Sequence, residues 1–430
     1  MEIFSSSPGI IALNFLMDWW WVLLPVLFYR PFLFLWLYRK QEVFASKQRS
    51  ILLELKAPPE VLKPIKAMEN VFAGLWQFYD PANPREKWLE GKYQLSFSIE
   101  IVSTEGEVHF YLRIPEPARR LVESALYAQY PAAELHEVED YTQQIPRDIP
   151  NKEWDLWGLS YTFGKPNPYP IKTYASFFEE GATEKEEVRI DPITHLVEAL
   201  SKCGPGEHVW IQMVLWPITT NEYNYVKEGN EIVAKLVRRQ PPPKPPTFFQ
   251  DLGTVSTVLM TGQAPSPQQP GQQDILPPEM RITPGEREIV SAIERKISKY
   301  AFLVAPRFVY LAKRDSYFGA AKALPMSYFT QFSTATFNQF LPLRVTITKV
   351  HTVLFWLFDA RRLFVRKRRL MRNYIMRMSP FFPNMSHRLL LNIEELATIF
   401  HLPGRITAPS FAVPRVEAKK GEPPPTLPTE

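Results

Sequence analysis

The stretch that decides the fold is FSIEIVSTEGEVHFYLRIPEPARRLVESALYAQYP, residues 97–131. Its first part alternates apolar and polar residues, with Phe97, Ile99 and Ile101 on one face, which is typical of a half-buried strand. The turn at residues 103–106 leads into a second alternating run. The two runs therefore predict an antiparallel hairpin.

The segments after the hairpin predict one helix and one further strand. Pro117 suits the first turn of a helix, and Pro131 marks its end. The acidic run Glu134–Asp140 follows as a strand. One helical face would carry Leu121, Val122, Ala125 and Leu126. The whole unit reads as strand, strand, helix, strand.

Two further helix-then-strand patterns follow along the chain. Asp191 is the expected N-cap of the first helix, which precedes the apolar strand 208–216. Thr283 and Glu286 form a capping-box pattern before the second helix, which leads to the apolar strand 302–311. Strands this apolar are expected to be buried on both faces, so helices should cover an α+β sheet of ferredoxin-like character.

Near the N-terminus, residues 19–38 form an apolar run that is long enough for the roughly 30 Å hydrocarbon core of a bilayer. We therefore predict a single transmembrane helix within residues 1–40. Aromatic side chains at both ends suit the headgroup zones, and one arginine lies mid-span. The predicted anchor residues are Trp19, Trp20, Trp21, Arg30, Trp36 and Tyr38.

The charges around this run predict its orientation. No Lys or Arg precedes Arg30, whereas Arg39 and Lys40 follow the run directly, so the N-terminus is expected outside and the bulk of the protein in the cytoplasm. Two alternatives stay open. A cleaved signal peptide would need a basic start and a small-residue cleavage site, and a membrane-surface helix would suit the interruptions at Pro25 and Pro31.

The remaining organisation follows from composition and periodicity. Residues 41–56 read as a helix that continues out of the membrane, and residues 61–79 as another. The Pro-rich segments have too little periodicity to fold alone and read as spacers. The predicted division is a 1–40 anchor, 41–90 juxtamembrane helices, a 91–238 α+β domain, a 239–284 Pro-rich linker, a 285–416 second α+β or helical region and a 417–430 extended tail.

Catalytic and metal-binding motifs are missing from the sequence. It contains no G-x-x-x-x-G-K-[ST], G-x-G-x-x-G or G-x-S-x-G pattern and no H-E-x-x-H spacing. The cluster His136–Asp140 would split between two faces of a strand, so it is not expected to hold a metal. Cys203 is the single cysteine, which excludes intrachain disulfides. We expect a protein that is not an enzyme and takes no cofactor.

A basic cluster lies on a long helix expected from about residue 352. Its members are Arg361, Arg362, Arg366, Lys367, Arg368, Arg369, Arg372 and Arg377. The side chains are candidates for contact with the phosphates of nucleic acid or of anionic lipid. The alternative is a solvated helix paired with acidic neighbours, which is what most charge runs are. The net charge of +5 is too modest to decide between these interpretations.

Several segments together resemble the N-terminal, non-motor half of membrane-anchored type IV secretion and conjugation coupling ATPases. They include residues 97–131, IPNKEWDLWG, YPIKTYASFFE, RIDPITHLVEALSK with GEHVWIQMV, and LNIEELATIFHLPG. In that family the last helix and a Pro-rich tail precede a hexameric P-loop domain that pumps DNA. Here the chain stops at Glu430, where that domain would begin.

The resemblance implies a scaffold or adaptor subunit at the membrane, which would position a separate P-loop ATPase. It also implies self-association into an oligomer. No catalytic residue carries over, because the Walker residues are missing. The runner-up function is binding of a membrane surface or nucleic acid by the 361–377 helix.

Overall fold

The structure is a computed structural model that describes residues 8–58, 61, 63–177, 191–237, 282–350, 356–380 and 387–404. The side chains of residues 8–23, 26 and 356 lie outside this description. Helices and an antiparallel sheet are mixed along the described chain, which confirms the predicted α+β class.

The helices are α1 (Pro8–Lys47), α2 (Lys66–Trp76), α3 (Arg119–Gln129), α4 (Pro192–Leu200), α5 (Tyr225–Leu236), α7 (Pro284–Ile297), α8 (Ala323–Thr330), α9 (Asp359–Ile375) and α10 (Ile393–Ile399). The strands are β1 (Ser50–Lys56), β2 (Phe97–Thr104), β3 (Glu107–Pro115), β4 (Glu134–Val138), β5 (Trp154–Phe163), β6 (Glu207–Ile218), β7 (Ala301–Lys313), β8 (Phe340–Pro342) and β9 (Leu389–Asn392). Short helical turns include η1 (Glu86–Glu90) and η3 (Tyr141–Gln143).

The first part of the sheet is built from the unit β1-α2-β2-β3-α3-β4. Its strands lie in the order β4-β1-β3-β2, and all neighbours are antiparallel. This is the strand-helix-strand-strand-helix-strand pattern of ferredoxin-like units. The predicted hairpin is confirmed, with Thr104 opposite Glu107 at its turn.

One sheet continues through the strands that follow. Strand β6 pairs with β2, and β7 pairs with β6 along its whole length from Ala301 to Ala312. The full order of the described sheet is β4-β1-β3-β2-β6-β7-β5-β8, and β9 pairs with β7. Strands from both sides of the Pro-rich segment therefore belong to the same sheet.

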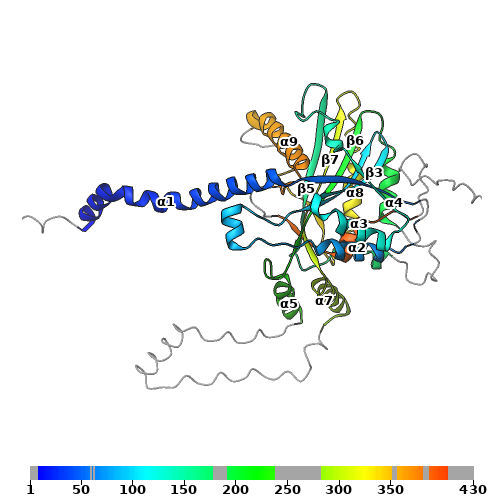
Figure 1. Cartoon of the computed structure of the whole chain (residues 1–430), viewed down its shortest axis with the longest axis horizontal. Helices are drawn as coiled ribbons and strands as arrows, with labels where there is room; N and C mark the ends of the chain where they lie inside the picture. The colour runs from blue at the N-terminus through cyan, green and yellow to red at the C-terminus, as the bar shows by residue number, and fades with distance from the viewer. Residues whose placement is uncertain are drawn as a thin grey trace, which may run out of the picture.

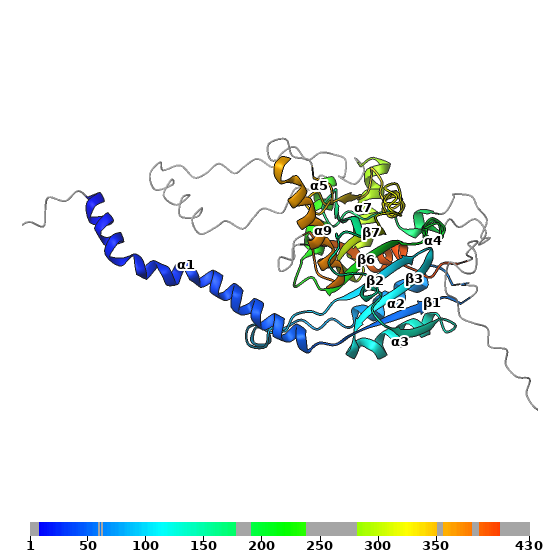
Figure 2. The ribbon, with the colours of Figure 1, turned by 90° about the horizontal axis from the view of Figure 1, so that it is seen from above.

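The two faces of the sheet are covered differently. The larger apolar core lies on one face, under α2, α3, α4, α8 and α10. A smaller core on the other face includes Trp210 of β6 together with Leu370, Met371 and Tyr374 of α9. Helix α9 rises from this second face, while α1 extends away from the body (Figures 1 and 2).

The helix predicted over residues 41–56 is wrong in its second half. Helix α1 ends at Lys47, and the next residues form strand β1 between β3 and β4. Leu53 and Leu55 point into the larger core, whereas Leu52 points into the smaller one. Strand β1 pairs with a neighbour along both of its edges, and this pairing buries the run. The burial stabilises the strand more than a continuation of α1 would stabilise a helix here.

The half-buried character predicted for the first hairpin strand is also wrong. All of β2 except its last residue is buried, including the polar Ser98 and Glu100. The end of α9 and the η3 turn cover the face that carries these two side chains. The apolar strands at residues 208–216 and 302–311 are buried as predicted.

The predicted membrane-spanning helix, and with it the single-pass topology and the membrane localisation, is wrong. Within the described residues, no helix combines the length and apolar character that crossing a bilayer requires. Helix α1 runs for 40 residues, but Pro25 and Pro31 lie inside it. Arg30 and the polar groups of Trp and Tyr side chains also lower its apolar character.

Three expectations fall outside the described residues. These are the Pro-rich linker at 239–284, except its last three residues, the extended tail at 417–430, and the side chains of Trp19, Trp20 and Trp21.

The predicted N-caps are confirmed. Asp191 accepts a hydrogen bond from the Ile193 amide, and Thr283 and Glu286 form a complete capping box.

Candidate functional site

A row of polar side chains crosses the sheet on the face that α9 covers. Each member stands opposite the next in the strand register, so the row continues through seven neighbouring strands. We call it the polar row, and its members are His136, Glu54, Tyr111, Glu100, Gln212, Arg307 and Ser160. Side chains in such a register lie close enough to interact from strand to strand.

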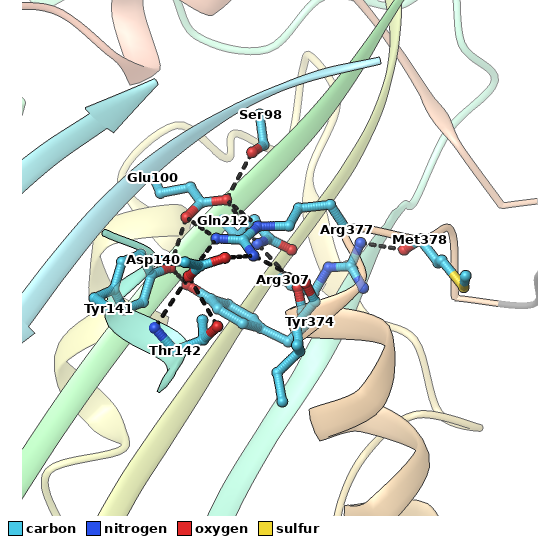
Figure 3. A network of polar contacts seen from close by, with 11 residues as sticks. Ser98, Glu100, Asp140, Tyr141, Thr142, Gln212, Arg307, Tyr374, Arg377 and Met378 are labelled. Atoms are coloured by element: carbon cyan, nitrogen blue, oxygen red, sulfur yellow. Dashed lines mark hydrogen bonds and ion pairs between the residues drawn. The ribbon is translucent and has the colours of Figure 1, made fainter. Parts of the chain in front are cut away.

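At the centre of the row, Glu100 and Arg377 form a buried ion pair (Figure 3). Arg377 Nε and Nη2 donate to the two carboxylate oxygens of Glu100 at 3.0 and 3.2 Å. The same guanidinium donates to Asp140, which precedes η3. Arg377 follows the last turn of α9, so this bidentate pair fixes the end of α9 to the sheet.

Further donors satisfy the Glu100 carboxylate. Ser98 Oγ and Tyr141 Oη each donate to it at 2.6 Å, and Gln212 Nε2 donates at 2.9 Å. Burial alone would raise the pKa of Glu100, but the Arg377 charge and these hydrogen bonds outweigh it and leave the pKa below its ordinary value. The carboxylate is therefore ionised at neutral pH.

Arg307 lies next to this network and is also buried. Its Nη2 donates to the Met378 carbonyl, while Nε and Nη1 have no hydrogen-bond partner in the described structure (Figure 3). Burial lowers the pKa of Arg307 to about 10, so the guanidinium still carries its charge at neutral pH. The segment that follows α9 is therefore attached to the sheet at two points. The Met378 carbonyl binds Arg307 of β7, and the Arg377 side chain binds Glu100 of β2.

Sequence reasoning missed this network. It assigned Arg377 to phosphate contact, and that assignment does not fit the structure, because the side chain is 4% exposed and pairs with two carboxylates. A signal that could have pointed to part of the network is a polar residue in the middle of a strongly apolar strand, as Gln212 is in the 208–216 strand and Arg307 is in the 302–311 strand.

The other seven basic residues of the predicted cluster divide into two groups. Lys367 donates to Asp155 at 2.6 Å and Arg366 donates to the Ile347 carbonyl, so these two serve the packing of α9. The exposed residues are Arg361, Arg362, Arg368, Arg369 and Arg372. Within the described residues, no acidic side chain pairs with Arg361, Arg368, Arg369 or Arg372.

An open groove of about 570 Å³ lies beside α9. Phe364 and Arg368 line it from the helix, and Arg368 lies 5.2 Å from the centre of the Phe364 ring. Lys152 and Arg314 line it from the loop before β5 and the turn after β7. We call it the α9 groove. It brings three cations and one exposed aromatic ring to a shared surface.

A second buried ion pair lies below a different pocket, of about 230 Å³. Lys296 of α7 lies 3.1 Å from Glu395 of α10, and both side chains are almost fully buried. Burial lowers the pKa of Lys296 and raises that of Glu395. The Glu395 carboxylate also accepts from the Ile171 and Asn392 amides, so it joins α7, α10 and the segment after β5.

The predicted anchor residues for which side chains are described lie on the part of α1 near the body. Trp36 Nε1 donates to the Trp88 carbonyl of η1 at 2.9 Å, and Lys40 lies 5.0 Å from the Trp36 ring. Arg30 and Tyr38 are exposed. The Trp36 contact therefore helps hold the base of α1 against η1.

Comparison of the sequence with protein-family models and with curated proteins gives no match. The resemblance to coupling ATPases therefore stays a prediction. In the described residues, no group of three or more His, Cys, Asp or Glu side chains is placed to hold a metal ion.

Proposed function

We propose that this protein is a scaffold or adaptor subunit that works by binding other macromolecules, in an apparatus of the type IV secretion or conjugation kind. Its partner would be a separate P-loop ATPase. The chain would also bind further copies of itself. The order of the sequence segments that resemble coupling ATPases supports this proposal. So does the shape of the molecule, in which α1 extends far from the folded body (Figure 2).

The observation that carries the proposal is the exposure of large apolar side chains on α1. Exposed side chains in such number, on one continuous helix, mark an interaction surface. They are Leu27, Phe28, Tyr29, Phe32, Phe34, Leu35, Trp36 and Tyr38. Since no described side chain of α1 belongs to either core of the sheet, the exposed apolar side chains from Leu27 to Leu35 offer a surface to a partner.

Affinity purification of the full-length chain from its native cells, in mild detergent, tests this proposal. We expect a P-loop ATPase among the recovered proteins. Replacing Phe28, Phe32 and Leu35 by serine should abolish its recovery without unfolding the sheet. A matched variant with Arg361 and Arg369 changed to glutamine should keep the partner. Recovery of no P-loop ATPase with the unchanged chain would contradict the proposal.

A second candidate function is binding of phosphate groups by α9. Exposed Arg361, Arg368, Arg369 and Arg372 favour it, because no acidic side chain among the described residues pairs with them, whereas surface charge runs are usually balanced by acidic neighbours. Helix α9 projects from the sheet (Figure 1), and these four side chains are exposed along it from Arg361 in the first turn to Arg372 in the last, where they can reach a polymer or an anionic surface.

Loss of three of these charges should weaken binding and flatten its salt dependence. For the variant R361Q/R369Q/R372Q, the slope of log K against log salt concentration should fall by roughly 2 with single-stranded nucleic acid, at about 0.7 per phosphate contact. Fluorescence anisotropy titrations at several salt concentrations measure this slope. An unchanged slope would show that these arginines make no phosphate contacts.

A further inference from the structure

The α9 groove combines features of charge and shape that suit one class of ligand. Phe364 lines the groove and is 44% exposed, although large aromatic side chains are usually buried. Lys152, Arg314 and Arg368 line the groove together with this ring, and all three are exposed. Asp148 is the one acidic side chain that lines the groove, so the groove carries net positive charge.

One of the charges in the groove, that of Arg314, is held in place and is only partly balanced by its neighbours. Arg314 Nε donates to the Asn151 carbonyl at 3.0 Å, which fixes its guanidinium at the edge of the groove. The nearest carboxylate, Asp155, lies 3.8 Å from Arg314 Nη1 but only 2.6 Å from Lys367 Nζ. Lys367 is therefore the closer partner of Asp155, and these three groups together keep a net positive charge beside the groove.

The walls of the groove are also rigid. On one side, Leu370 and Met371 bury the following turn of α9 in the smaller core. On the other side, the Asn151 side chain accepts hydrogen bonds from the Glu153 and Trp154 amides. A binding surface that is already ordered loses little conformational entropy when a ligand binds.

A path for a chain-like ligand continues along α9 beyond the groove. Arg361, Phe364, Arg368 and Arg372 are spaced by three, four and four residues, so they share one face of the helix. At 1.5 Å per residue this face extends for about 16 Å. It carries three cations and one aromatic ring, which matches a polymer that carries both phosphates and flat bases.

We infer that the α9 groove binds single-stranded nucleic acid, with a base stacked on Phe364 and phosphates against Lys152, Arg314 and Arg368. This inference rests on the phosphate-binding function proposed for α9 and names its ligand. Base stacking on exposed aromatic rings next to cations is the usual mode of single-strand binding. A duplex keeps its bases stacked on one another, so it cannot offer one to Phe364.

Anisotropy titration of the full-length chain with a labelled oligothymidylate tests the inference. Replacing Phe364 by alanine should weaken binding roughly 5- to 100-fold, while the salt slope stays unchanged because no charge is lost. Tryptophan at position 364 should restore binding. The matched control is Val365→Ala, because Val365 is similarly exposed on α9 but does not line the groove.

The outcomes separate this inference from the function on which it rests. If F364A binds as well as the unchanged chain while R361Q/R369Q/R372Q binds more weakly, α9 contacts phosphate but the stacking site is refuted. If duplex and single strand bind equally, the stacking site is refuted as well. If the unchanged chain binds neither, but binds vesicles that contain phosphatidylserine, the ligand is lipid and the inference fails.

Discussion

Replacing Glu100 by alanine is expected to lower the free energy of unfolding by about 3–5 kcal/mol, because it leaves the buried Arg377 without its main counter-charge. Asp140 is the remaining acidic partner, and it is partly exposed. Urea denaturation of the full-length chain measures the change. The matched control is Glu107→Ala on the neighbouring strand, where the side chain is 67% exposed and a change below about 0.5 kcal/mol is expected.

The pair can also be removed as a unit. Glu100→Leu combined with Arg377→Met should recover much of the stability lost in E100A, because the buried Arg377 charge is removed together with its main partner, while Asp140 keeps its hydrogen bonds from Thr142. If E100A were as stable as E107A, the network would contribute nothing to holding α9, and Arg377 would not fix the end of this helix to the sheet.

Acidification should act on the same network. The pKa of Glu100 lies below its ordinary value of 4.5 in the folded protein, so the folded state binds fewer protons than the unfolded state. The stabilisation from Glu100 is therefore complete above about pH 4.5 and is lost as the pH falls through the folded pKa. Denaturation curves between pH 7 and pH 3 should show a steeper loss for the unchanged chain than for E100A.

Replacing Glu395 by alanine is the second change expected to cost about 3–5 kcal/mol of unfolding free energy. It leaves Lys296 buried, with the Tyr169 carbonyl as its remaining hydrogen-bond partner among the described residues. It also removes the capping box of α10, since Glu395 accepts from the Asn392 amide. Thermal and urea unfolding of the full-length chain measure the effect.

The opposite replacement should be milder. In Lys296→Met, the Glu395 carboxylate keeps the Ile171 and Asn392 amides as donors, whereas E395A leaves an ammonium group almost unsolvated. Glu288→Ala at the rim of the same pocket is the control, because Glu288 is exposed. A larger loss of unfolding free energy in K296M than in E395A would contradict this expectation. It would show that an unpaired Glu395 carboxylate destabilises the fold more than an unpaired Lys296 ammonium group.

Local signals in the sequence predicted the elements whose structure depends on near neighbours. The hairpin at residues 97–115 has a turn and two alternating runs, and the capping residues Asp191 and Thr283 need only the next few amides. These predictions are confirmed. The second half of the predicted 41–56 helix is in fact a strand. Near neighbours in the sequence could not reveal this, because the two strands with which it pairs, β3 and β4, come much later in the chain.

The polar network was beyond local reasoning for the same physical reason. The alternation in the sequence predicts that Ser98 and Glu100 lie on the solvent-exposed face of a strand. Nothing nearby in the sequence reveals that Arg377, which follows Glu100 by 277 residues, packs on this face. Five of the eight basic residues singled out from the sequence are exposed on α9, and their contact with phosphate stays a prediction. Lys152 and Arg314 were missed, because they meet Phe364 only through the tertiary fold.

The polar row has a consequence for how the strands find their alignment. If the pairing of two neighbouring strands shifted by one residue, the side chain that one strand contributes to the polar row would point to the opposite, apolar face of the sheet. Arg307 would then meet the core under α4 and α8 instead of the carbonyl that it binds. The seven side chains thus disfavour mismatched pairings among strands drawn from remote parts of the chain.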